Sequence, residues 1–576
     1  MHVALVFLLM SGGAAISQQS EPSAEAHAKS LYELGMAALE RGDLSAALDT
    51  FQNLVFVAPK SPEAHNSYGW VLLHQGRTDA AIVEFQQAVQ LRPEFSQAHL
   101  NLANALSAKQ DFARAETEAR ESARLTPKDS EARRTLGRVL SFRGQLEEAL
   151  VEMRAAVGLE PQRPELHDEL GSILVQSNQS DEAAAEFSQA LRLKPDFPDA
   201  SLHLGILRWR QKDLTGAHDL LAKASANNPN GAQAHYFYGR VLEDDKQNEQ
   251  AIGEFSKAAA LQPTLADAQE HLGLLLQRKG DGEGAVAAFR TLVQLRPEDP
   301  EAHNNLGLAM IQAGDASHAI GEFENALRIK PGDAGFVENL GTAYLQTTDF
   351  AAAVTQFELA CKIAPADATA HYDLGLALKL QDKLSDALVE FRKAAELSPD
   401  QPDIHYTLGV TLWQSGDFPA AEEELGAAVR AKPDYAEAYY TLGTVLRQEG
   451  KLESAVEALR KAISLNSDLV GAHTNLATVL RRQGHTAEAD AENQRGQLLL
   501  QRSNDLQQAA LDTNSGRKLL QSGDLDGSIS QFRAAIKVAP DYAPAHRFLA
   551  TALEQKGDKV GADKESRRAA DLAQAK

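Results

Sequence analysis

The chain has 576 residues, of which 80 are acidic and 57 are basic, so its formal net charge is −23. This balance argues against binding to nucleic-acid phosphates or to anionic lipid surfaces, because both require clustered lysine and arginine. The single cysteine, Cys361, excludes an internal disulfide, and we expect it to be a buried and unreactive thiol.

Residues 1–17 are expected to form a signal peptide. The apolar residues 3–10 are followed by small residues, with plausible cleavage after Ala15 or Ser17. This predicts an exported protein, periplasmic or secreted; the protein is cytoplasmic if the segment does not act as a signal. The apolar run is too short to cross a bilayer, so no transmembrane span is expected. Residues 18–27 are expected to be a short linker.

A 34-residue period begins at Ala28. Fourteen blocks align without insertion over residues 28–503, and two more occupy residues 509–576. Position 8 of the block is Gly or Ala in all sixteen, position 20 is Ala in fifteen, and position 32 is Pro in thirteen. A fixed period of this kind indicates a repeat architecture. Residues 504–508 are expected to be a helical insertion or hinge, and the polar last block is expected to cap the array.

Each block is predicted to form two amphipathic helices, A and B. In residues 300–333, apolar side chains recur at spacings of three to four in two runs, one around Leu306 and one around Phe323. Glycine at position 15, present in ten blocks, suits the left-handed residue that ends helix A. Proline at position 32, such as Pro331, prevents helix B from continuing.

Glycine at position 8 is unfavourable inside a helix by about 1 kcal/mol relative to alanine, yet thirteen blocks have it. We therefore expect helices A and B to approach closely there, with the leucine at position 7 and the aromatic at position 24 filling the seam. The repeat signature comprises Gly35, Gly69, Gly137, Gly307, Ala319, Phe323 and Pro331.

The pattern Leu306-Gly307, Ala319-x3-Phe323 and Pro331 resembles the tetratricopeptide repeat (TPR), over residues 28 to 576. The resemblance implies an all-α TPR α-solenoid, a right-handed superhelix of about sixteen helix-turn-helix repeats. The residues of the blocks are most similar to those of the repeat superhelix of O-linked N-acetylglucosamine transferase. The catalytic domain that follows the superhelix in the transferase is not expected here.

Motifs that carry chemistry are missing from the sequence. It has no His-Glu-x-x-His, no serine-centred elbow and no paired cysteines. Nine histidines occupy position 4 of their blocks, but residues one repeat apart cannot converge on one ion, so we expect them to be packing residues. We predict a non-enzymatic protein with no cofactor and no metal.

The resemblance implies that helix A lines a concave groove, with positions 2, 5, 9, 12 and 13 facing it and position 6 beside it. Aromatic side chains at these positions suit a peptide partner, because they bury large areas at low entropic cost. These candidates are Trp70, Trp209, Tyr236, Tyr372, Tyr406, Trp413 and Tyr440. The alternative is that tyrosine at position 5 is only a residue that recurs in this lineage of repeats.

Polar groove candidates also follow from the resemblance. The transferase binds extended peptide backbones through an asparagine ladder at position 6, which is interrupted here, for example by Glu169. The corresponding residues are Asn101, Asn305, Asn339, Asn475 and Asn514. The carboxylate clamp of chaperone-binding members is disfavoured because Glu165 and Glu169 reverse its charge, although Arg134 and Arg138 remain candidates for a partner carboxylate.

The sequence thus predicts a protein-protein interaction scaffold that binds an extended peptide or helix of an unknown protein partner in its groove. The alternative is a structural or assembly subunit of a cell-envelope complex, in exopolysaccharide secretion or pilus biogenesis.

Overall fold

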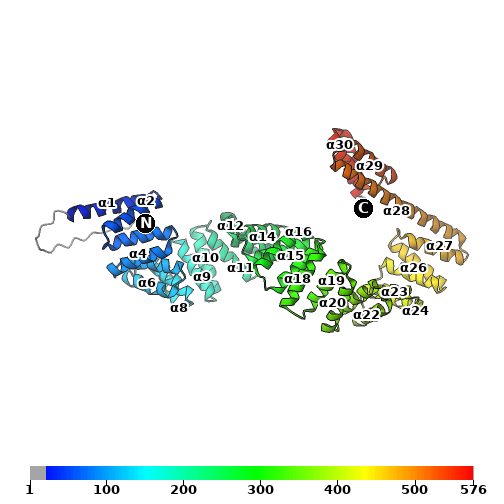
Figure 1. The fold of residues 1–576 in the computed structure, drawn as a ribbon, viewed down its shortest axis with the longest axis horizontal. Helices are drawn as coiled ribbons and strands as arrows, with labels where there is room; N and C mark the ends of the chain where they lie inside the picture. The colour runs from blue at the N-terminus through cyan, green and yellow to red at the C-terminus, as the bar shows by residue number, and fades with distance from the viewer. Residues whose placement is uncertain (1–20, 575–576) are drawn as a thin grey trace. The chain divides into compact units, whose positions relative to one another are not determined.

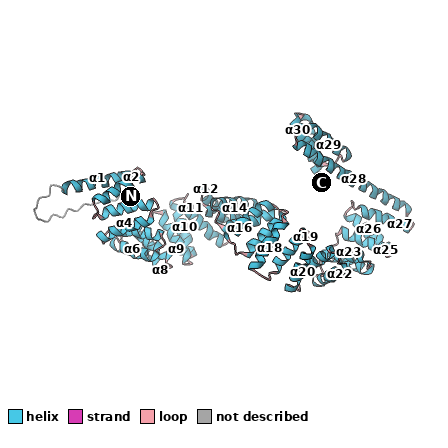
Figure 2. Cartoon of the chain, viewed as in Figure 1, coloured by secondary structure: helices cyan, strands magenta, loops and turns pink. Residues whose placement is uncertain are grey.

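The computed structural model describes residues 21–574, which form 31 helices joined by short turns (Figure 2). No strand occurs in this range. Each repeat contributes a helix A and a helix B, which confirms the α-solenoid predicted from the period. The count is odd because one helix belongs to two repeats.

The chain divides into two compact units, Met1–Leu295 and Arg296–Lys576. The first contains sixteen helices (Figure 1): α1 (Glu21–Glu40), α2 (Leu44–Val57), α3 (Pro62–His74), α4 (Thr78–Leu91), α5 (Ser96–Ala108), α6 (Phe112–Leu125), α7 (Ser130–Phe142), α8 (Leu146–Leu159), α9 (Pro164–Gln176), α10 (Ser180–Leu193), α11 (Pro198–Arg210), α12 (Leu214–Asn227), α13 (Ala232–Asp244), α14 (Asn248–Leu261), α15 (Ala266–Lys279) and α16 (Gly282–Leu295).

The second unit contains α17 (Pro300–Gln312), α18 (Ala316–Ile329), α19 (Ala334–Gln346), α20 (Phe350–Ile363), α21 (Ala368–Leu380), α22 (Leu384–Leu397), α23 (Pro402–Ser415), α24 (Phe418–Ala431), α25 (Ala436–Gln448), α26 (Leu452–Leu465), α27 (Val470–Arg482), α28 (Thr486–Gln521), α29 (Leu525–Val538), α30 (Ala543–Lys556) and α31 (Lys559–Gln574). Helix A of a repeat packs on its own helix B, and helix B packs on the next helix A, as α17, α18 and α19 do. The core therefore runs along each unit through nearest-neighbour contacts.

Glycine at position 8 makes room for a side chain of helix B. A Cβ atom on Gly307 would lie 2.6 Å from Cε1 of Phe323, whose ring is fully buried. All thirteen glycines at this position face Phe, Leu or Met at position 24. The three repeats with alanine at position 8 have Ala119, Asn493 or Ser566 at position 24 instead. The predicted close approach is thus confirmed, and in most repeats the ring edge, rather than the backbone of helix B, fills the space.

Position 15 has a left-handed backbone in all sixteen repeats. Ten repeats have glycine there, for example Gly314 at φ 83°, which confirms the predicted end of helix A. Six repeats adopt the same conformation with another residue, among them Gln110 at 62° and Thr348 at 62°. The turn between helices A and B therefore requires this conformation whichever residue stands there.

Two helices differ from the expected segments. α1 begins at Glu21, so residues 21–27, expected in a linker, are helical; Pro22 is tolerated in the first turn, and Ala and Glu favour the helix after it. α28 has 36 residues and runs without interruption through residues 504–508 (Figure 1). The expected insertion is therefore part of one helix that serves as helix B of the fourteenth repeat and helix A of the fifteenth. The expected signal peptide lies outside the described residues.

Candidate functional site

The candidate site is the surface formed by positions 2, 5, 6, 9, 12 and 13 of the A helices within one unit, which we call the helix-A face. Successive A helices contact each other directly, as α5 and α7 do in the first unit and α23 and α25 in the second. Side chains at equal positions therefore form rows that cross several helices.

Positions 5 and 6 form a row of hydrogen bonds between neighbouring repeats. Asn101 Nδ2 donates to Asn66 Oδ1 at 2.8 Å. The same bond recurs at 2.8 Å from Asn339 Nδ2 to Asn304 Oδ1. Arg134, His203 and Tyr372 make bonds of the same register with Glu169, Asp168 and Thr407. This row holds adjacent A helices together.

The expected asparagine ladder is wrong for Asn101. It is 8% exposed, and its Oδ1 accepts a further hydrogen bond from Gln97 Nε2 at 3.1 Å, so both ends of the amide are used within the chain. Asn475 donates to Thr444 Oγ1 at 2.9 Å, and Asn305 is half-buried. The side-chain amides of Asn101, Asn339 and Asn475 thus form hydrogen bonds with neighbouring repeats rather than with a peptide backbone.

The tyrosines at position 5 lie between repeats. Tyr236 is only 7% exposed and accepts a hydrogen bond from Arg240 Nη1 at 3.1 Å, so the expectation that it faces the groove is wrong. Tyr406 packs on Tyr435 with ring centroids 5.1 Å apart. The hydroxyl of Tyr440 lies 2.5 Å from where Gly471 would carry a Cβ atom. These contacts favour the alternative that tyrosine belongs to the packing of this repeat.

Arg134 is also unavailable to a partner carboxylate. Its Nε and Nη1 donate to Glu169 at 2.8 Å and to Glu131 at 2.9 Å. The hydrogen bond to Glu169 raises the pKa of Arg134, against the opposing effect of burial. The neighbouring candidate Arg138 is exposed and remains accessible.

The tryptophans at position 12 share one geometry. Trp209 Nε1 donates to Asp244 Oδ2 at 2.7 Å, and Trp413 Nε1 donates to Gln448 Oε1 at 2.6 Å. Both acceptors stand at position 13 of the next repeat, and both indoles are half-buried. Each indole is thus held by its polar edge while part of its ring stays accessible. Trp70, at position 9, stacks on His74 with centroids 3.6 Å apart.

A hollow of about 240 Å³ opens on the helix-A face of the first unit. Ser172, Val175, Phe187, His203, Ile206, Leu207 and Arg210 line it. Its apolar walls suit an aliphatic or aromatic side chain, and the exposed Arg210 supplies a positive charge. Burial opposes protonation of His203, but its hydrogen bond to Asp168 prevails, so the pKa of His203 is raised.

The nine histidines at position 4 form a repeated clamp. In the second repeat, His65 Nδ1 lies 2.6 Å from Glu84 Oε2, and His65 Nε2 lies 3.0 Å from the carbonyl oxygen of Pro59. The other eight make the same two contacts, with the carbonyl oxygen of Ser467 in place of that of a proline for His473. Arg133 replaces histidine in the same role against Glu152 and Pro127. Because both partners of the ring are acceptors, a doubly protonated imidazole satisfies both. The clamp joins helix A, helix B and the end of the preceding repeat.

This clamp has a sequence signal that the analysis of single positions missed. In all ten repeats with Glu at position 23, position 4 is His or Arg, and in the other six it is neither. Comparing positions 4 and 23 across the sixteen repeats therefore identifies the pairing without a structure. The contacts of the clamp confirm that these histidines are packing residues.

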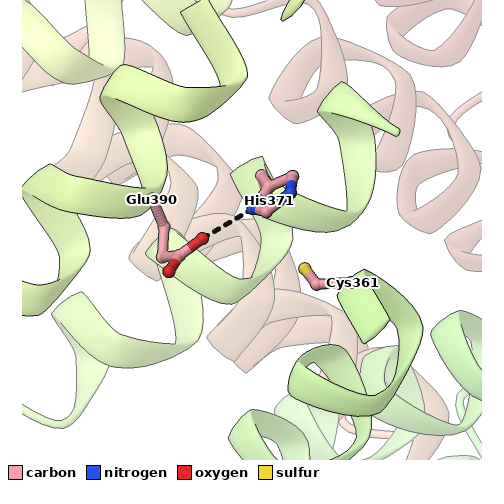
Figure 3. A group of neighbouring side chains, drawn as sticks. All are labelled: Cys361, His371 and Glu390. Atoms are coloured by element: carbon pink, nitrogen blue, oxygen red, sulfur yellow. Dashed lines mark hydrogen bonds and ion pairs between the residues drawn. The ribbon is translucent and has the colours of Figure 1, made fainter. Parts of the chain in front are cut away.

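Cys361, His371 and Glu390 form a cluster with three possible metal-ligand atoms within 4.8 Å of one another (Figure 3). Both ring nitrogens of His371 are already engaged, by Glu390 at 2.6 Å and by the carbonyl oxygen of Pro365 at 3.3 Å. Burial, followed by nearby carboxylates, raises the pKa of Cys361 to about 12. The clamp therefore accounts for the His371–Glu390 pair, and Cys361 stands where most other repeats have Val, Ala, Leu or Ile.

Family comparisons agree with this architecture. Models described as tetratricopeptide repeat match residues 32–99, 169–229, 214–266, 271–334, 406–470 and 513–574, and related repeat models match 72–139, 130–155, 336–367, 378–416 and 470–492. No curated protein matches the sequence. No helix among residues 21–574 has the length and apolar character needed to cross a bilayer.

Solved structures share the repeat at low similarity. The crystal structure of the APC/C Cut9–Hcn1 hetero-tetramer is 14% identical, with 93% of this chain and 99% of that chain covered and a TM-score of 0.35. PilF of Pseudomonas aeruginosa is 21% identical, with coverage of 36% and 95% and a TM-score of 0.33. YrrB, described as a TPR protein with an unusual peptide-binding site, is 23% identical, with coverage of 33% and 97% and a TM-score of 0.29. Likenesses this weak carry no information about function.

Proposed function

The chain belongs to the tetratricopeptide repeat family, and from this premise we propose that it is a non-enzymatic interaction scaffold whose helix-A face binds a segment of a partner protein. Arrays of this kind expose a long surface on rigid helices. Such a surface suits an extended peptide or a helix, because the helices need not rearrange on binding.

The observation that carries the proposal is the fixed orientation of the position-12 indoles. Trp209 and Trp413 are each anchored through Nε1 to the following repeat and are left partly accessible. A large aromatic surface that is already immobilised loses little entropy when a partner packs on it. The hollow beside Val175 and Ile206 offers a matching place for an apolar side chain in the first unit.

Selection from a displayed library of random peptides tests the proposal. The purified protein should enrich peptides whose binding is weakened by Trp209→Ala or by Trp413→Ala, with unchanged melting of the variant. Leu359→Ala on α20 is a control, because it removes a 43% exposed apolar side chain from a helix B. If no peptide is enriched, or if Leu359→Ala weakens binding as much as the tryptophan variants, the helix-A face is not the binding surface.

We also propose that the protein is exported, on the basis of residues 1–17 alone. N-terminal sequencing of the protein from cells that make it should find a mature start after Ala15 or Ser17. An intact N-terminus in the cytoplasmic fraction would contradict export. Participation in an envelope complex stays a prediction from the sequence.

A further inference from the structure

Three side chains at position 12 form a consecutive row in the second unit. Lys379 lies on α21, Trp413 on α23 and Arg447 on α25. All three are half-buried. The row therefore places a cation on each side of the anchored indole.

Among the residues that the structure describes, Lys379 has no anionic partner. Its Nζ donates to Thr411 Oγ1 on α23 at 3.2 Å. Burial lowers the pKa of Lys379, and no neighbouring charge contributes. A partly desolvated ammonium group is stabilised when a carboxylate approaches, because the anion compensates for lost hydration.

Arg447 also has a nitrogen without an acceptor in the described part of the chain. Its Nε is buried and has no hydrogen-bond acceptor among the described residues. Arg134, on the helix-A face of the first unit, shows the contrast, because two carboxylates satisfy its guanidinium. Since no carboxylate among residues 21–574 pairs with Arg447, its terminal Nη groups can make a bidentate contact with an incoming carboxylate.

Side-chain hydrogen bonds connect the three residues into one surface. The hydrogen bond to Thr411 brings the ammonium group of Lys379 onto α23, which also carries Trp413. The indole of Trp413 bonds to Gln448, the sequence neighbour of Arg447. The two cations are thus separated by roughly one inter-helix spacing, about 8–10 Å, or about three residues of extended chain.

We propose that the Lys379–Trp413–Arg447 surface binds an extended acidic segment of a partner protein, with two carboxylates about three residues apart and an apolar side chain between them against the indole. This inference rests on the proposed function and specifies the chemistry of its partner. The chain as a whole has a net charge of −23, so an acidic segment is attracted only where cations gather on the surface. The two cations therefore attract the acidic segment and also fix its position along the helix-A face.

Fluorescence anisotropy with defined peptides tests the proposal. The probes are ten-residue glycine-serine peptides with two glutamates three residues apart and one leucine between them, and the same peptides with glutamine in place of glutamate. The glutamate peptide should bind about tenfold more tightly than the glutamine peptide, a difference that shrinks between about 50 and 300 mM salt. Equal binding of the two peptides would overturn the proposal.

Charge-removing variants locate the contact. Lys379→Gln and Arg447→Gln should each weaken binding of the glutamate peptide about fivefold or more. Lys393→Gln is a matched control, because Lys393 is an exposed cation on α22, a helix B of the same repeat as Lys379. Thermal melting checks the fold of each variant, and hydrogen exchange on the wild type should show protection of α21, α23 and α25 by the glutamate peptide. Protection elsewhere, or equal losses in the control, would refute the assignment.

The outcomes also separate this inference from the broader function. If displayed peptides bind through Trp413 but show no preference for acids, the interaction scaffold stands and the acidic partner is wrong. If neither the defined nor the displayed peptides protect these helices, both proposals fail.

Discussion

Replacing Gly307 by alanine tests the packing on which every repeat depends. The new Cβ atom would lie 2.6 Å from Cε1 and 2.7 Å from Cζ of Phe323, a ring that is fully buried and has little room to move. Overpacking of this kind costs about 1–3 kcal/mol, while alanine gains about 1 kcal/mol over glycine in a helix. Gly321→Ala in α18 measures the gain in helix propensity alone, because nothing lies within 4 Å of its added Cβ atom.

The difference between the two variants therefore measures the clash. Hydrogen exchange of α17 and α18 at native conditions is the suitable assay, because long repeat arrays do not unfold in two states. Exchange should be roughly five- to 150-fold faster in Gly307→Ala than in Gly321→Ala. In a Phe323→Ala background, which reproduces the Ala103–Ala119 pair of the third repeat, Gly307→Ala should become stabilising. Equal stabilisation by both single variants would refute the reasoning.

Three further outcomes follow from the structure. The Glu84 hydrogen bond raises the pKa of His65 above its ordinary value, so the clamp's stabilisation is complete below about pH 6.5 and is lost as the pH rises through the folded pKa. Hydrogen-exchange protection of α3 and α4, taken relative to the intrinsic exchange rate at each pH, should fall over that range, whereas the protection of α7 and α8, held by Arg133, should not change. Thr348→Gly should slow hydrogen exchange of α19 and α20 by relieving a left-handed β-branched residue at φ 62°, a conformation that costs about 1–2 kcal/mol, and Thr347→Gly should not. Cys361, with its pKa raised to about 12, should react with iodoacetamide at pH 8 far more slowly than glutathione does, as followed by mass spectrometry.

Most of the fold was predictable because the same packing and helix-ending residues recur in the sixteen repeats. Gly307, Phe323 and Pro331 each have a local role that their spacing already indicates, and the structure confirms the helix pair, its turn and its close approach. The fusion of two helices into α28 was only partly predictable, since an inserted segment without glycine or proline at 504–508 can continue a helix or break it.

The site was harder to predict because position in a repeat does not determine which neighbour a side chain meets. Asn101 and Arg134 stand at groove positions, but a partner 35 residues away, in the next or the preceding repeat, occupies each of them. Such pairs depend on the residues of two adjacent blocks together, so they cannot be recognised when each block is considered alone. Lys379 has the opposite property, since only the packed helices show that no carboxylate within residues 21–574 pairs with it.

Site-specific photocrosslinking tests most directly the central claim that the helix-A face receives a partner. Benzoylphenylalanine would replace Leu380 at the end of α21, which is 55% exposed, or Val389 on α22, which is 60% exposed. In cells that make the protein, the probe at Leu380 should capture a discrete protein adduct that Trp413→Ala abolishes, while the probe at Val389 should capture none. The same adduct from Val389, or an adduct at Leu380 that is indifferent to Trp413→Ala, would contradict that claim.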